Sequence, residues 1–139
     1  MRAIHTLRGT VDAATKKIVF DNDLRNVGWK IKEFYYWANN MDANPYVWGK
    51  LWIGNDDGGS LSFSDAQDNR AIAWAQSSGT TAESLNTTFV DPDHVVTGQL
   101  RVINGAGDSA AYLIVLEQIT LSTDQEIMAL IKERSQDDI

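Results

Sequence analysis

The sequence contains no cysteine, only two prolines and two histidines, and no long apolar run in its 139 residues. Without cysteine, disulfide bonds, thiolate metal sites and cysteine nucleophiles are excluded. The longest apolar run, residues 110–116, is too short to cross a bilayer, so we expect no membrane contact. The residues after Met1 lack the apolar segment of a signal peptide, so we also expect no secretion signal.

Basic residues are scarce in the second part of the chain. Residues 1–50 carry eight Lys/Arg against five Asp/Glu, a net charge of +3, whereas residues 51–139 carry four against fourteen, a net charge of −10. A pI near 4.6 leaves no cationic surface for phosphate groups, so we expect no direct nucleic-acid contact. The uneven charge fits either an ordinary solvated surface or copies that meet basic face to acidic face.

Most of the chain consists of short β-like runs separated by clusters of Gly, Asn and Asp, a spacing typical of a sandwich or barrel. No helical period occurs among these runs. We therefore predict an all-β domain, an antiparallel two-sheet sandwich with one C-terminal helix. A jelly roll is the favoured arrangement and an immunoglobulin-like sandwich is the alternative. The predicted strands lie at residues 2–9, 17–20, 29–37, 46–53, 61–63, 70–75, 85–90, 94–103 and 110–119.

Two of these runs make specific predictions about burial. Strict alternation over residues 29–37 places one set of side chains on a common face: Trp29, Ile31, Glu33, Tyr35 and Trp37. Residues 110–119 are nearly all apolar, so we expect a central strand that is covered on both faces.

The period changes after residue 121. Thr123 and Glu126 form a capping box, and an amphipathic helix is predicted from Asp124 to Arg134. Its apolar stripe could cover the domain's own sheet or dock on a neighbour, and it consists of Ile127, Leu130 and Ile131. We assign residues 1–121 to the sandwich and residues 122–139 to the helix and a polar tail of the same domain.

The sequence gives little support for catalysis. It has neither a G-x-S-x-G motif nor a phosphate-binding glycine loop. The segment Asp91-Pro92-Asp93-His94 could be a metal site or a pH-sensitive contact, but a turn capped by Asp91 explains it better. We expect the turn, in which replacement of His94 leaves folding nearly intact, and we predict no enzyme, no catalytic residue, no metal and no cofactor.

Aromatic residues are the most informative feature. Seven Trp and Tyr residues fall within a short window, and two of them, Trp48 and Trp52, are predicted to share a strand face with Lys50 between them. Such rings can form the sandwich core, a platform for sugar rings, or a subunit interface. Our candidates for an interface or a ligand site are Trp48, Trp52, Tyr36, Ile127, Leu130 and Ile131.

Several segments resemble small proteins of marine bacteriophages. The resemblance covers most of the chain and is carried by residues 1–12, Gly28–Phe34, Phe89–Val96, and the strand Tyr112–Leu116 with the short helix that follows. It implies a virion structural role, as a capsid or capsid-associated jelly-roll protein, and it supplies no functional residues.

With this resemblance, we expect a bacteriophage virion structural protein that acts through protein–protein assembly. Its expected partners are copies of itself, as a homo-oligomer, and other virion proteins. Its expected location is the virion, assembled in the host cytoplasm. The alternative is a carbohydrate- or receptor-binding β-sandwich module that recognises a glycan.

Overall fold

The computed structural model of the protein describes residues 3–39, 46–53, 70–78, 85–105 and 108–122. Within these residues it contains eight β-strands and no helix. The strands are β1 (Ile4–Val11), β2 (Thr15–Asp21), β3 (Val27–Ala38), β4 (Tyr46–Ile53), β5 (Ala71–Ser78), β6 (Leu85–Val90), β7 (Gln99–Asn104) and β8 (Ala110–Thr120).

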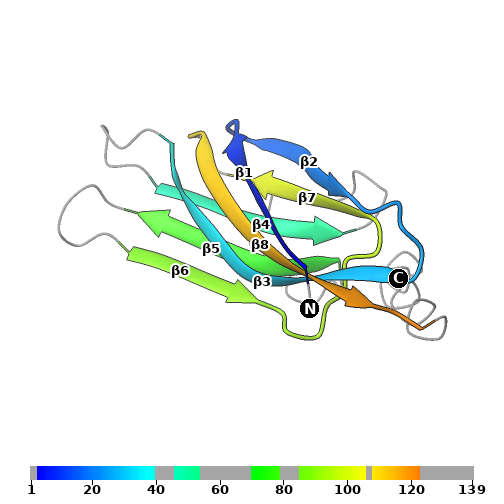
Figure 1. The fold of residues 1–139 in the computed structure, drawn as a ribbon. Helices are drawn as coiled ribbons and strands as arrows, with labels where there is room; N and C mark the ends of the chain where they lie inside the picture. The colour runs from blue at the N-terminus through cyan, green and yellow to red at the C-terminus, as the bar shows by residue number, and fades with distance from the viewer. Residues whose placement is uncertain (1–2, 40–45, 54–69, 79–84, 106–107, 123–139) are drawn as a thin grey trace, which may run out of the picture.

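The strands form two antiparallel sheets that pack face to face (Figure 1). One sheet has the order β1-β8-β3 and the other has the order β2-β7-β4-β5-β6. The first strand pairs with the last, the second with the seventh and the fourth with the fifth, as in the wrapped ribbon of a jelly roll. The predicted two-sheet sandwich is confirmed. The arrangement departs from a complete wrap at β6, which pairs with β5 and so joins the five-stranded sheet.

The central strand of the smaller sheet is β8, as its apolar sequence predicts. Its side chains at Tyr112, Ile114 and Leu116 are buried between the sheets, where they meet the core face of the larger sheet. The prediction that both faces are covered is wrong for the other face, because Leu113 and Val115 are only half-buried. This outer face therefore exposes apolar surface that the described part of the chain does not cover.

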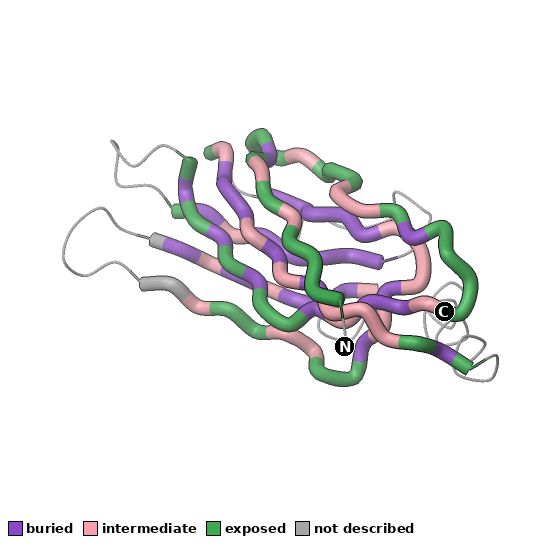
Figure 2. Tube along the Cα trace, viewed as in Figure 1, coloured by how far each residue is buried: buried purple, intermediate pink, exposed green. Residues whose placement is uncertain are grey.

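A β-bulge in β3 overturns the predicted alternation of that strand. The register against β8 shifts between Ile31 and Glu33, so Lys32 is the extra residue. Trp29 and Ile31 face the core before the bulge. After it, the inward side chains are Phe34, Tyr36 and Ala38, while Glu33, Tyr35 and Trp37 are exposed. Figure 2 shows the resulting change of buried and exposed positions along β3.

A glycine makes room in the core for the ring of Tyr36. A Cβ atom added at Gly49 would lie 2.6 Å from the tyrosine ring, so only glycine allows this close approach. The Tyr36 hydroxyl donates a hydrogen bond to the carbonyl oxygen of Trp48 at 3.3 Å. Burial raises the pKa of Tyr36 well above its ordinary value, as expected for a neutral phenol in the core.

The segment from Asp91 to Gly98 joins the two sheets. The Asp91 N–H donates to the carbonyl of Ile72 in the larger sheet, whereas Val96 pairs with Trp29 in the smaller sheet through two backbone hydrogen bonds. Residues 94–98, which were predicted to begin a strand, are thus a crossing segment with one isolated bridge.

Several predictions lie outside the described residues. They are the C-terminal helix at 124–134, the polar tail and the strand at 61–63. No helix long and apolar enough to cross a membrane occurs in the described ranges.

Candidate functional site

The predicted interface candidates occupy different places in the structure. Tyr36 belongs to the core, and Trp48 is half-buried against the same core. Trp52 is 1% exposed and lies in a separate cluster with Ala71 and Ile103. Two of the predicted surface candidates, Tyr36 and Trp52, are therefore buried within the subunit. The other three, Ile127, Leu130 and Ile131, lie outside the described residues.

Trp52 lies on the face of the larger sheet that points away from the smaller sheet. The Lys50 ammonium nitrogen lies 5.1 Å from the ring centroid, and the Arg70 guanidinium carbon lies 4.9 Å from it. Cations at these distances are attracted by the ring quadrupole, and the attraction strengthens when they are desolvated. Because Lys50 is also fully buried, this cluster is a structural element and offers no accessible ring to a ligand.

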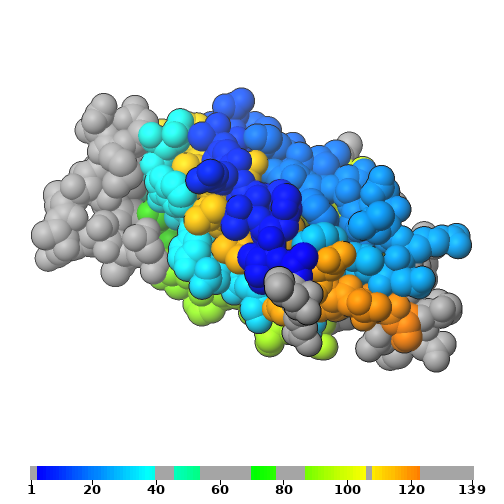
Figure 3. Space-filling model, viewed as in Figure 1, coloured from blue at the N-terminus to red at the C-terminus, as the bar shows by residue number. Residues whose placement is uncertain are grey.

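Two exposed aromatic residues, Tyr35 and Trp37, lie on the outer face of the smaller sheet, which we call the β1–β8–β3 face. Figure 3 shows this side of the molecule. The other exposed aromatic residues of this kind, Tyr46 and Phe89, belong to strands of the larger sheet. Tyr35 is 45% exposed and Trp37 is 42% exposed. In the sheet register Tyr35 lies opposite Leu113, and Glu33 lies opposite Val115. Trp37 lies opposite Ala111 in the same register, so the two aromatic side chains of β3 lie beside aliphatic side chains of β8 and form an apolar strip with them.

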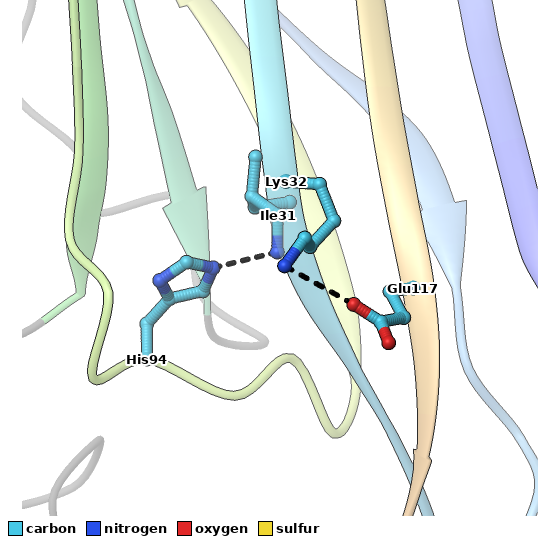
Figure 4. A network of polar contacts seen from close by, with 4 residues as sticks. All are labelled: Ile31, Lys32, His94 and Glu117. Carbon is cyan, nitrogen blue, oxygen red and sulfur yellow. Dashed lines mark hydrogen bonds and ion pairs between the residues drawn. The ribbon is translucent and has the colours of Figure 1, made fainter. Parts of the chain in front are cut away.

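Charged groups border this strip. The Lys32 ammonium group forms a salt bridge of 3.2 Å with Glu117, as Figure 4 shows. Glu33 lies two residues before Tyr35 on the same face, and its hydrogen bond and negative charge raise the pKa of the Tyr35 phenol. The phenol is therefore neutral at physiological pH. An apolar centre with a charged border is the usual composition of a protein–protein contact.

The Asp91–His94 segment is a turn, as predicted, but His94 has a further role. The Asp93 N–H donates to the Asp91 side chain at 2.9 Å, which closes an Asx turn. The ring of His94 is buried, and its Nε2 accepts a hydrogen bond of 2.8 Å from the backbone N–H of Ile31 (Figure 4). An N–H can only donate, so Nδ1 carries the proton and donates to the Asp91 carbonyl. His94 thereby links the turn to the open edge of β3.

This geometry corrects the prediction that His94 is dispensable. We expect His94→Ala to lower the free energy of unfolding by about 1–3 kcal/mol, because it leaves the Ile31 N–H buried and unpaired. Asp93→Asn is the matched control, because it keeps the backbone N–H that donates to Asp91 and nearly the same side-chain shape, and it should change stability by less than about 0.5 kcal/mol. Urea denaturation of both variants measures the difference, and equal stabilities would disprove the bridging role.

A polar hollow of about 610 Å³ lies beside the connection between β1 and β2. Its side chains include three cations and one carboxylate, but the cations are engaged. Lys17 donates to the Thr10 carbonyl at 3.0 Å, and Arg101 donates to the Gln99 side chain at 2.8 Å. The described residues also contain no group of three side chains that could hold a metal ion. The accessible feature best suited to recognition is therefore the β1–β8–β3 face.

The sequence contained a signal for this face. Residues 110–116 are apolar at every position, which requires a cover on both sides of the strand. The described chain supplies only one cover, and Tyr35 and Trp37 flank the uncovered side.

Comparisons with known proteins give no relative: no protein-family model, curated protein or solved structure matches the chain.

Proposed function

We propose that this chain is a structural subunit of a bacteriophage virion, which assembles through protein–protein contacts of its β1–β8–β3 face. The observation that carries the proposal is the uncovered apolar side of β8. Leu113 and Val115 are half-buried in the isolated subunit, beside the exposed rings of Tyr35 and Trp37. The phage assignment rests on the sequence resemblance, and the two-sheet fold is compatible with it.

The chemistry of the face favours a protein partner. Tyr and Trp bury large areas at a low cost in conformational entropy, and they are the residues that dominate binding energy at interfaces. A sheet face is flat, so it suits another flat surface better than a small ligand, which usually needs a concave site. A specific contact buries on the order of 1,200–2,000 Å² in total, so the partner must extend beyond the four apolar side chains.

One observation supports the alternative of a glycan-binding module. Tyr35 and Trp37 are two residues apart on one exposed face, which places their Cα atoms about 7 Å apart. Rings at this spacing can stack against the apolar faces of successive sugar units. The neutral Tyr35 phenol beside Glu33 adds polar groups for sugar hydroxyls. This module would bind oligosaccharide without self-association through the same face.

The double variant Tyr35→Ser, Trp37→Ser tests the proposal. Both side chains are exposed, so we expect a change in the free energy of unfolding below about 1 kcal/mol. Assembly should weaken by more than about 2 kcal/mol if the rings are central to the contact. Leu24→Ser is the matched control, because Leu24 is 55% exposed and lies in the connection between β2 and β3.

Sedimentation velocity and incorporation into particles measure the effect. Normal assembly by the folded double variant would contradict the proposal. An unassembled wild-type protein that oligosaccharide columns retain, with retention lost in the double variant, would establish the glycan-binding module instead.

A further inference from the structure

The two sheets have four edge strands, and three of them carry features that oppose pairing with another chain. Charged side chains and bulges are the usual protection of a sheet edge. β1 carries Arg8, and β2 carries Lys16, Lys17 and a register shift. β3 carries two lysines, a glutamate and its bulge, and part of its edge is already occupied by Val96 and His94.

The fourth edge strand, β6, has none of these features. Its sequence Leu-Asn-Thr-Thr-Phe-Val contains no charged residue and no proline. Its register against β5 is unbroken from Leu85 to Val90. Phe89 is 61% exposed, the highest exposure among the large apolar side chains of the described residues. In Figure 1, β6 forms the outer border of the five-stranded sheet.

The hydrogen-bond pattern shows which backbone groups of β6 face outward. The N–H of Asp91 points inward, to the carbonyl of Ile72. Backbone direction alternates along a strand, so the N–H and C=O groups of Asn86, Thr88 and Val90 point away from β5. No other strand in the described part of the chain pairs with this edge.

We propose that β6 pairs antiparallel with β6 of a second copy about a two-fold axis at Thr88, which joins two five-stranded sheets into one. Self-pairing requires a strand that is compatible with its own reversed sequence. In this register Thr88 lies opposite itself, and Asn86 lies opposite Val90 of the second copy. No like charges meet, whereas self-pairing of β2 would bring lysines together.

This pairing gives a partner both to the outward backbone groups of β6 and to the exposed side chain of Phe89. It forms about six backbone hydrogen bonds from the outward groups of the two strands. It also places Phe89 opposite Thr87 of the second copy, at the closer spacing of a pair without mutual hydrogen bonds. An edge of six residues is a small contact, so we expect a dissociation constant in the range of about 1–100 µM, with many such contacts reinforcing one another in an assembly.

Proline at an outward position tests the proposal without removing a hydrogen bond inside the subunit. Thr88→Pro deletes an outward N–H, so the variant should fold but dimerise at least about tenfold more weakly. Thr6→Pro is the matched control on β1. The Gln118 N–H donates to the Ala3 carbonyl, so alternation points the Thr6 N–H outward as well. Circular dichroism verifies folding, and sedimentation velocity measures the dissociation constant.

Cysteine cross-linking provides a second test that does not depend on proline tolerance. The natural chain has no cysteine, so a single introduced thiol has no competitor. Thr88→Cys should form a disulfide-linked dimer, because residues directly opposite in such a pair have Cα atoms about 5.5 Å apart, within disulfide range. Thr6 is also exposed, and Thr6→Cys should cross-link far more slowly.

A folded Thr88→Pro variant that dimerises like the wild-type protein would overturn the proposal. So would cross-linking of Thr88→Cys no faster than that of Thr6→Cys, or a wild-type protein that stays monomeric at about 1 mM. The inference goes beyond the proposed function and does not require it, because the pairing uses backbone groups of β6 whereas the proposed assembly contact uses side chains of β3 and β8. If Thr88→Pro loses the dimer while the double variant Tyr35→Ser, Trp37→Ser keeps it, the result would support β6 pairing alone.

Discussion

Replacement of Ile114 by alanine is expected to lower the free energy of unfolding by about 2–5 kcal/mol. Ile114 is fully buried at the centre of β8, where it contributes to the main hydrophobic cluster between the sheets. The loss combines the transfer free energy of the deleted atoms with the cost of a cavity that the two sheets cannot close. Urea or thermal denaturation gives the value directly.

The neighbouring residue is the matched control. Val115 lies on the other face of the same strand and is half-buried, so Val115→Ala should cost less than about 1 kcal/mol in the monomer. Both variants remove β-branched carbon atoms from one strand, so differences in strand propensity largely cancel. Similar losses for the two variants would contradict the assignment of core and outer faces.

Replacement of Trp52 by alanine is expected to cost about 3–5 kcal/mol, although the residue was first a candidate for the interface. The ring is 1% exposed and packs with Ala71, Ile103 and Trp74, near the cations of Lys50 and Arg70. Its removal therefore deletes a large buried area and the stabilising contact with two positive charges. The midpoint of urea denaturation should fall accordingly.

Trp52→Phe separates packing from hydrogen bonding. The indole Nε1 is buried and has no hydrogen-bond partner among the described residues, so phenylalanine removes an unsatisfied donor while it keeps an aromatic ring. We expect this variant to lose less than half of the stability that Trp52→Ala loses. A folded Trp52→Ala variant of normal stability that fails to assemble would restore the interface hypothesis for this residue.

The sequence was sufficient for the architecture and for the central strand. The apolar run at 110–116 predicts β8, because a short apolar run that contains β-branched and aromatic residues is typical of a buried strand. The prediction that both faces of β8 are covered failed for the outer face, because the described chain provides no cover there. That failure is informative, because the half-buried Leu113 and Val115 are the basis of the proposed interface.

Two further failures have local causes. The alternation of residues 29–37 is regular in sequence, but a bulge at Lys32 reverses the faces, and a bulge leaves no clear mark in the residue types. His94 was expected to be an ordinary turn residue, because its partner Ile31 is distant in sequence and the contact depends on how the crossing segment meets β3. The sequence pattern indicated Tyr36 as a surface candidate, whereas, because of the bulge, the exposed side chains in the structure are those of its neighbours Tyr35 and Trp37.

The pairing of β6 with β5 is likewise visible only in three dimensions. A regular jelly-roll wrap would place the sixth strand beside the third, whereas here it extends the sheet of β5. The absence of charged residues in β6 indicates an unprotected edge only once β6 is known to be an edge strand.

Oxidative footprinting of the protein before and after assembly tests the central claim most directly. Tyr35 and Trp37 are exposed in the isolated subunit, so hydroxyl radicals should label both. If the β1–β8–β3 face is the assembly contact, labelling of both rings should fall severalfold in the assembled state, while Leu24 stays as reactive as before. Unchanged labelling of Tyr35 and Trp37 in an assembly would contradict the proposed interface.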